Sequence, residues 1–173
     1  MIARFSAPDG TFYDTSDDHE TLVTRPRDVQ DNAVPSGNAM AATVLLKLGA
    51  YTGEARYTQI AEKALSALQG GFQQYPTAFG QWLVAFEFAV GRPKEIAVVG
   101  DPDSAETLAM LDVIFSGFRP NQVVALKRPG ETSPIPLLDY REPIDGKVTV
   151  SVCQNFACQM PVTDPEALAE QLR

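Results

Sequence analysis

Apolar residues in the first half of the chain recur at helical spacing. Residues 40–51 repeat every three or four positions, and the same spacing returns over residues 57–68, where Gly70-Gly71 is expected to stop the helix. A third run extends from near Pro76 to Val90. Because only residues 52–54 join the first two runs, they predict an antiparallel helical hairpin.

The second half shows short, compact apolar runs of strand length. These runs lie at residues 95–100, 123–126 and 148–152. Asp101-Pro102-Asp103-Ser104 has the form of an N-cap followed by proline and predicts a helix to about Phe118. Thr163-Asp164-Pro165-Glu166 has the form of a capping box for a terminal helix. Helices followed by a strand-helix-strand unit predict an α+β fold with a small parallel or mixed sheet.

Three remaining segments predict little regular structure. Residues 1–13 favour a short hairpin around Ala7-Pro8-Asp9-Gly10, because proline followed by Asp-Gly is typical of a chain reversal. Residues 14–32 are rich in acids and poor in apolar residues, which indicates a polar loop, and residues 129–145 are also expected to be loop.

Composition narrows the classes of partner. The 173 residues carry a net charge of −8 and a pI near 4.6, so the chain repels nucleic acid and anionic membranes. The apolar stretches are too short to span a bilayer, and no secretory leader follows Met1, so we expect a cytoplasmic protein without a membrane partner. Two cysteines and one histidine exclude a disulfide framework and most zinc sites. We expect no cofactor or metal.

The polar run from Arg25 to Asn38 is the main candidate for a binding site. It holds guanidinium, carboxylate, amide and hydroxyl groups, which match the hydroxyls of a sugar or polyol. The candidate contacts are Arg25, Asp28, Asp31, Asn32, Ser36 and Asn38. The structural alternative is that Ser36 caps a helix, Asp28 pairs with Arg25, and Asp31 and Asn32 form turns. No catalytic residue is assigned.

Cys153 and Cys158 form the second candidate site. Their spacing differs from redox pairs with two intervening residues and from common zinc pairs. No Lys, Arg or His lies between Lys147 and Arg173 to lower a thiol pKa. We therefore expect reduced, structural thiols, with thiol chemistry as the alternative.

Two weaker signals favour structural interpretations. Gly100-Asp101-Pro102-Asp103 follows a strand as a phosphate-binding loop would, but its carboxylates would repel a phosphate. His19 lies among acids, and the sequence suggests no Ser or Cys nucleophile beside it, so we expect an exposed histidine.

Several motifs occur together and in a characteristic order. They are Phe12-Tyr13-Asp14-Thr15, Asp18-x-Glu20-x-Leu22, the run from Arg25 to Asn38, Tyr75-Pro76-Thr77-Ala78-Phe79 and Cys153-x-Asn155-Phe156-x-Cys158-x-x-Pro161. With these motifs the chain resembles the C-terminal part of the spermatogenesis-associated, thioredoxin-domain-containing family, whose bacterial members are called YyaL-type.

The resemblance implies an architecture and leaves two functions open. Family members carry a thioredoxin-like domain, a six-hairpin α/α toroid similar to glycosidases, and a small α/β tail. Residues 1–92 would then be the last toroid hairpins and residues 93–173 the tail, in a chain that lacks the thioredoxin-like part. The first function is binding of a sugar or polyol, without complete catalysis. The alternative is a non-catalytic scaffold or interaction segment, with self-association or a partner chain that completes the toroid.

Overall fold

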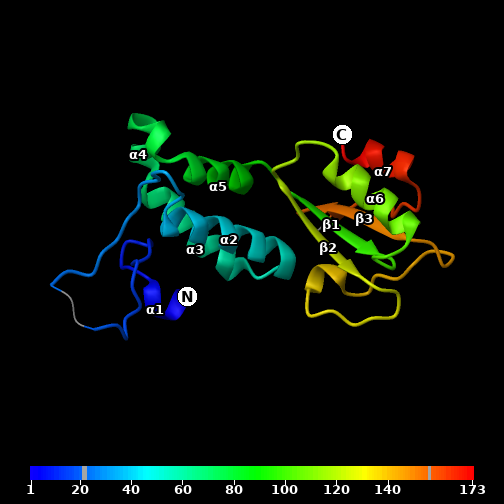
Figure 1. Ribbon diagram of the computed structural model, residues 1–173, viewed down its shortest axis with the longest axis horizontal. Helices are drawn as coiled ribbons and strands as arrows, with labels where there is room; N and C mark the ends of the chain where they lie inside the picture. The colour runs from blue at the N-terminus through cyan, green and yellow to red at the C-terminus, as the bar shows by residue number, and fades with distance from the viewer. Residues whose placement is uncertain (21–22, 156) are drawn as a thin grey trace. The chain divides into compact units, whose positions relative to one another are not determined.

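The computed structural model describes residues 1–20, 23–155 and 157–173. Leu22 and Phe156, which belong to the motifs above, lie outside the described residues. The chain divides into two compact units, one of residues 1–49 and 54–90 and the other of residues 50–53 and 91–173. The fold class is α+β, as the sequence predicts, with helices followed by a mixed sheet (Figure 1).

The first unit is helical. It contains α1 (Ile2–Phe5), most of α2 (Gly37–Thr52), α3 (Ala55–Ala67), α4 (Gln69–Gln74), the 3-10 turn η1 (Pro76–Ala78) and α5 (Gly80–Val90). Trp82 and Phe88 on α5 and Leu45 on α2 are buried, and Phe72 of α4 packs near Phe79 and Trp82. These large side chains supply much of the apolar surface that holds the helices together.

The apolar face of α2 differs from the predicted one. Within the predicted stripe of residues 40–51, Ala41 and Leu45 are buried, but Met40 and Val44 are 43% and 46% exposed. Ala39, Ala42 and Leu46, which lie outside the predicted stripe, are buried as well. Small residues at the buried positions let neighbouring backbone approach closely. The wide run of apolar residues on this helix therefore covers two faces, and periodicity alone does not tell which one is buried.

Two local predictions about the first unit are wrong. Gly70-Gly71 does not stop the helix, because α4 runs through both glycines after a break at Leu68. The N-terminal hairpin is reduced to a single bridge between Ser6 and Phe12, and the residues before it form α1. The turn between them is present: Ala7 N donates to Thr11 O, and Gly10 adopts a φ of 97°, which favours glycine.

The second unit is a four-stranded sheet with helices against it. The strand order is β2-β1-β3-β4, with β1 (Lys94–Val99), β2 (Gln122–Lys127), β3 (Thr149–Gln154) and β4 (Ala157–Cys158). β1 pairs parallel to β2 and antiparallel to β3. The sheet is therefore mixed, one of the two arrangements that the sequence predicts, whereas β4 is not predicted.

Each face of the sheet has its own apolar cluster. On one face α6 (Ala105–Phe115) and α7 (Pro165–Gln171) cover Ile96, Val98, Val150 and Val152 (Figure 1). On the other face Ala97 and Ala125 pack with Leu138 of the 3-10 turn η2 (Pro136–Leu138). Alternation along β1 sends Ile96 and Ala97 to opposite faces, as the strand period requires.

Both helix caps in this unit lie away from the predicted residues. Ser104, not Asp101, is the N-cap of α6, and its Oγ accepts from Thr107 N. Asp164, not Thr163, is the N-cap of α7, and its side chain accepts from Ala167 N. In α7 the carboxylate next to Pro165 takes the cap position because proline fits the first helical position.

Candidate functional site

A cleft of about 550 Å³ opens in the first unit at the start of α2. Aromatic side chains of Phe5, Phe12 and Tyr13 line one part of it. Polar residues of the surrounding loops line the rest, namely Asp14, Asp28, Gln30, Asn32 and Ser36. Aromatic surface beside convergent polar groups is typical of small-molecule sites. Three of the six predicted contacts, Asp28, Asn32 and Ser36, therefore lie at one cleft.

Asp14 connects two loops at this cleft. One of its carboxylate oxygens accepts from the backbone N–H of Asp28 at 2.8 Å. Asp28 in turn accepts from Gln30 N at 3.1 Å, which forms a local Asx turn. Asp14 and Tyr13 are not among the predicted contacts, although both stand in the Phe12-Tyr13-Asp14-Thr15 motif.

Arg25 has a structural role. Its guanidinium donates to the carbonyl oxygens of Thr15 and Arg4, at 2.6 Å each, and lies 4.1 Å from the centre of the Tyr13 ring. It is absent from the cleft lining. Arg25 does not pair with Asp28 in these contacts; it holds the N-terminal segment through backbone carbonyls.

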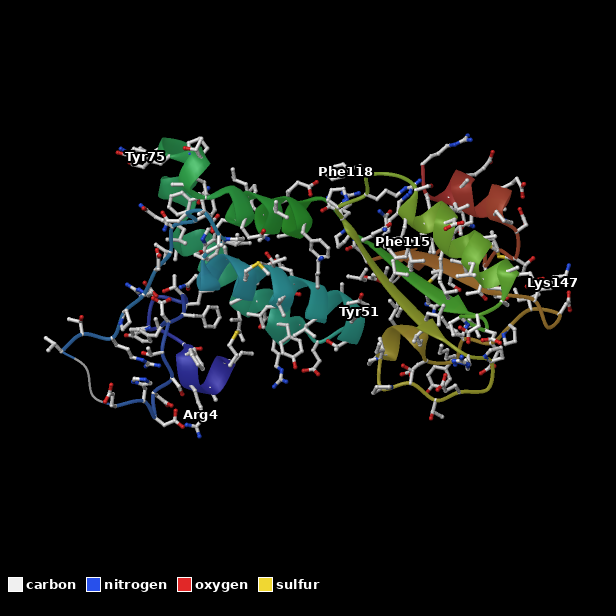
Figure 2. The ribbon with its side chains drawn as sticks, viewed as in Figure 1. Arg4, Tyr51, Tyr75, Phe115, Phe118 and Lys147 are labelled. Carbon is white, nitrogen blue, oxygen red and sulfur yellow. A yellow bond between two sulfur atoms is a disulfide. The ribbon has the colours of Figure 1, made fainter. Side chains whose placement is uncertain are left out.

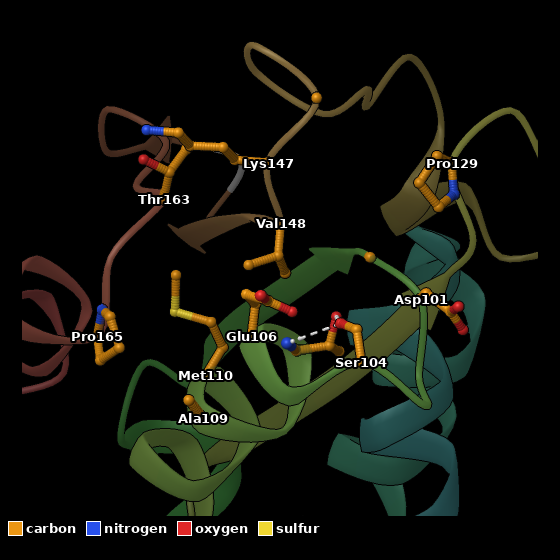
Figure 3. Close-up of a pocket in the computed structure, with 13 residues that line it drawn as sticks. Asp101, Ser104, Glu106, Ala109, Met110, Pro129, Lys147, Val148, Thr163 and Pro165 are labelled. Carbon is orange, nitrogen blue, oxygen red and sulfur yellow. Dashed lines mark hydrogen bonds between the residues drawn. The ribbon is translucent and has the colours of Figure 1, made fainter.

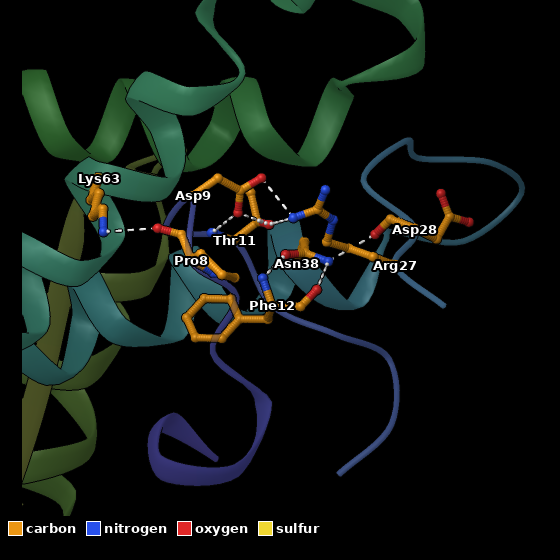
Figure 4. A network of polar contacts seen from close by, with 8 residues as sticks. All are labelled: Pro8, Asp9, Thr11, Phe12, Arg27, Asp28, Asn38 and Lys63. Carbon is orange, nitrogen blue, oxygen red and sulfur yellow. Dashed lines mark hydrogen bonds and ion pairs between the residues drawn. The ribbon is translucent and has the colours of Figure 1, made fainter. Parts of the chain in front are cut away.

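Asn38 is buried and hydrogen-bonded to two loops (Figure 4). Its Oδ1 accepts from Phe12 N at 2.6 Å, and its Nδ2 donates to Phe12 O at 2.8 Å and to Asp28 O at 2.9 Å. Its carbonyl oxygen and both amide hydrogens therefore have partners within the fold. Asn38 positions the backbone of Asp28, a cleft residue.

Asp31 and Ser36 position the helix starts. The two carboxylate oxygens of Asp31 accept from Ser36 N and from Gln81 N, both at 2.8 Å. Ser36 is buried, and its Oγ accepts from Ala39 N, which makes it the cap of α2. Asp31 thus joins the start of α2 to the start of α5.

A second polar network supports the N-terminal turn (Figure 4). Asp9 accepts from Thr11 N and Thr11 Oγ1, and Arg27 contacts Asp9 at 2.6 Å and Thr11 Oγ1 at 3.0 Å. The hydrogen bond from Thr11 lowers the pKa of Asp9 below its usual value, and Arg27 adds to the effect. The network fixes the turn that leads into Phe12 at the cleft.

A larger pocket of about 710 Å³ lies in the second unit, between the end of β1 and α6 (Figure 3). Asp101, Ser104 and Glu106 line it together with Lys147. Two amides of the first helical turn already have acceptors, since Ser104 O accepts from Leu108 N and Ser104 Oγ from Thr107 N. A side chain at Gly100 would overlap Thr107 and Val148, so this glycine serves close packing. The geometry agrees with the structural interpretation of this segment.

The prediction of reduced thiols is wrong, because Cys153 and Cys158 form a disulfide. They are paired across the antiparallel strands β3 and β4. The cation that sequence reasoning missed is Arg141, whose guanidinium lies 3.3 Å from Cys153 Sγ and 3.5 Å from Cys158 Sγ. Arg141 lies before Lys147, outside the segment between Lys147 and Arg173 that holds no Lys, Arg or His.

Three further observations concern metal ligands, the single histidine and membrane-spanning helices. Within residues 1–20, 23–155 and 157–173, no three His, Cys, Asp or Glu side chains are grouped as a metal site requires. His19 is exposed and contacts the carbonyl oxygen of Glu20. No helix in the described part of the chain is long and apolar enough to cross a bilayer. A cytoplasmic location stays a prediction.

Comparison with known proteins identifies homologues. Over 155 residues, which are 87% of this chain, it is 30% identical to spermatogenesis-associated protein 20 of Mus musculus and 31% identical to that of Rattus norvegicus. The human protein is 30% identical over the same length. The chain is homologous to part of spermatogenesis-associated protein 20. It spans about a fifth of the length of these relatives. No family model matches the chain.

Homology to spermatogenesis-associated protein 20 confirms the core of the resemblance drawn from the motifs. The thioredoxin-like domain and the α/α toroid that the resemblance implies stay predictions.

Proposed function

We propose that the chain is a binding module for a sugar or polyol, held in the cleft of the first unit. The observation that carries this proposal is the convergence of Asp14, Asp28 and Asn32 on a cleft that also has aromatic walls. Carboxylate and amide groups match vicinal hydroxyls, and aromatic rings stack against the apolar face of a sugar ring. Arg25, Asp31, Ser36 and Asn38 hold the loops and helix starts that form the cleft.

We propose binding without complete catalysis. Glycoside hydrolysis uses two carboxyl groups about 5 to 10 Å apart with distinct acid and base roles. Asp31 has both oxygens engaged by backbone N–H groups, which suits a structural role. Asp14 and Asp28 each accept one backbone N–H, which suits fixed hydrogen-bond acceptors for a ligand.

Trp82 gives a direct readout of ligand binding. Its indole N–H donates to the carbonyl oxygen of Val29 at 2.9 Å, and Val29 stands between the cleft residues Asp28 and Gln30. Trp82 is also the only tryptophan in the chain. We expect mono- and disaccharides or polyols to change its fluorescence with a dissociation constant in about the millimolar range or tighter.

The variants Asp28→Asn and Asn32→Ala test the site. Both residues are exposed, so the fold should survive, and each change should weaken ligand binding by about tenfold, the effect of losing one good hydrogen bond. Asp139→Asn, an exposed carboxylate in the second unit, is the matched control and should bind like the parent. A flat titration across the panel, or equal affinities for all three variants, contradicts the proposal.

A second candidate function is that of an interaction segment. Met40 and Val44 lie one turn apart on α2, and each is more than 40% exposed. On α5, Val84 and Val90 are 49% and 62% exposed. We propose that further helices cover these faces, either in a second copy or in a partner chain that completes a toroid. Light scattering over a concentration series, with pull-down of partner chains, tests this alternative.

A further inference from the structure

The disulfide of the second unit has one buried and one exposed end. Cys153 lies on β3 and is 2% exposed, whereas Cys158 lies on the short edge strand β4 and is exposed. The turn between the strands begins with Asn155 at a φ of 49°, a conformation that asparagine tolerates better than most residues. Cys158 is therefore the residue of the pair that a thiolate from solution can approach in the closed disulfide.

Arg141 is fixed beside both sulfur atoms. Its Nε donates to Leu137 O at 2.8 Å, which directs the other end of the guanidinium at Cys153 and Cys158. The side chain is only partly exposed, and burial lowers the pKa of Arg141. A neutral disulfide offers weak acceptors to this cation. A thiolate at the same place would be a much better partner, because its charge would form a charge-assisted hydrogen bond.

Glu95 provides the opposing charge. It is the cross-strand partner of Cys153 on β1, so the two side chains share a face of the sheet. Burial raises the pKa of Glu95, and Arg141 acts in the opposite direction. Among the described residues, Arg141 from the loop after η2 contacts both sulfur atoms, and the strand register places Glu95 of β1 opposite Cys153.

We propose that Cys153 and Cys158 form a reversible thiol–disulfide site that accepts two electrons from a dithiol. One thiolate of the dithiol attacks Cys158 Sγ and forms a mixed disulfide. The bond between Cys158 and Cys153 breaks, and its electron pair goes to Cys153 Sγ, which becomes a thiolate beside Arg141. The second thiol of the dithiol then attacks the mixed disulfide and releases Cys158. The dithiol leaves as a disulfide, and its two protons balance the two new protein thiols.

Arg141 acts in this proposal as a positioning residue that stabilises the Cys153 thiolate. A cation within about 4 Å lowers a neighbouring thiol pKa by about 1 to 3 units, and a lower thiol pKa favours the leaving group and the reduced state. The arrangement therefore distinguishes this disulfide from one that only joins two strands.

The test equilibrates the full chain with mixtures of reduced and oxidised dithiothreitol at fixed pH. Free thiols are then alkylated, and mass spectrometry gives the fraction of each cysteine that is reduced. We expect the parent to pass reversibly between the two forms with its circular dichroism spectrum retained. Arg141→Gln should need about tenfold more reductant for the same reduced fraction, and its Cys153 alkylation profile should shift to higher pH by about one unit.

Three further variants distinguish an effect of charge at the disulfide from a general loss of stability. Arg141→Lys keeps the positive charge and should restore part of the effect, whereas Arg128→Gln removes an exposed arginine of the same unit and should match the parent. Glu95→Gln removes the opposing carboxylate and should shift the equilibrium and the pH profile the other way. Opposite shifts in Glu95→Gln and Arg141→Gln cannot result from a general loss of stability.

Two results would overturn the proposal. One is a disulfide that stays closed in excess dithiothreitol while the chain is folded, which would make it a structural staple. The other is equal exchange equilibria and alkylation profiles in the parent, Arg141→Gln and Glu95→Gln.

Discussion

Asn32 and Asn38 show how burial separates two side chains of the same type in one segment. Asn38 is 1% exposed and uses its amide to hold Phe12 and Asp28, whereas Asn32 is exposed at the cleft. A buried amide that loses its partners leaves backbone groups unsatisfied, which costs far more than the loss of a hydrated contact. The two asparagines should therefore respond differently to the same substitution.

Asn38→Ala should lower the free energy of unfolding of the first unit by about 2 to 4 kcal/mol, because the Phe12 and Asp28 backbone groups lose their partners. Asn32→Ala should change it by less than about 0.5 kcal/mol. Urea titration followed by Trp82 fluorescence measures both, since Trp82 is buried in the same unit. Equal losses in the two variants would mean that Asn38 is not the anchor described above.

Because of the Asp9 network, the free energy of unfolding of the first unit should fall in acid. The folded pKa of Asp9 is lower than its ordinary value of 3.8, so ionised Asp9 stabilises the folded state above that value and the contribution is lost as pH falls through the lower folded pKa. Asp9→Asn should lose less than about 1 kcal/mol at neutral pH, because the carboxylate is about half exposed. The gap to the parent, measured by urea titration, should close as pH falls below 3.8 and through the lower folded pKa of Asp9. A difference in the free energy of unfolding that does not change with pH would contradict this prediction, because it would not depend on the charge of Asp9.

At the scale of single residues, the sequence predicts which residues lie in or near the cleft better than it predicts what each of them contacts. The run from Arg25 to Asn38 does hold polar groups of the cleft, but Asp31 and Asn38 engage backbone groups that are distant in sequence. Asp31 accepts from Gln81, and Asn38 pairs with Phe12. Sequence patterns describe near neighbours and do not show which distant backbone a side chain meets.

At the scale of elements, the stability of the first turn of a helix depends on a single hydroxyl or carboxylate group that caps it. Ser104→Ala should destabilise the first turn of α6 by about 1 kcal/mol, because Thr107 N loses its acceptor. Hydrogen exchange of the α6 amides measures this loss locally. Ser116→Ala, at the exposed C-terminal end of the same helix, is the control and should leave exchange nearly unchanged. Faster exchange in both variants alike would contradict a specific capping role.

The elements with a clear pattern of apolar residues are predicted from sequence, whereas α4 and β4 are not. The spacing of apolar residues locates α2, α3 and α5, and compact apolar runs locate β1, β2 and β3. α4 is missed because it passes through Gly70-Gly71, where tertiary packing of Phe72 against Phe79 outweighs the low helix propensity of glycine. β4 is missed because two exposed residues have no apolar period.

At the scale of the whole molecule, each unit carries exposed apolar side chains. Tyr75 in the first unit is 56% exposed, and Phe115 and Phe118 in the second are 62% and 96% exposed (Figure 2). With Met40 and Val44 of α2, these residues support the second candidate function. Large exposed apolar groups that cluster on a surface favour association.

Val44→Lys should reduce self-association of the chain at least severalfold, because a charge in the middle of the exposed α2 face opposes its burial. Sedimentation or light scattering over a concentration series measures this. Lys47→Gln, a polar change on the same helix, is the control, since Lys47 is exposed and outside the apolar stripe. Unchanged association in Val44→Lys would remove α2 from the interface.

The strand order also has a consequence for synthesis of the protein on the ribosome. β1 lies between β2 and β3, yet β3 begins 50 residues after β1 ends, at Thr149. A nascent chain that already contains β1 and β2 therefore presents an unpaired row of backbone groups along the other edge of β1. This edge can pair with another nascent chain until β3 emerges and occupies it. Slow translation between Lys127 and Thr149 would lengthen that interval, so codon choice in this stretch should affect the yield of folded protein.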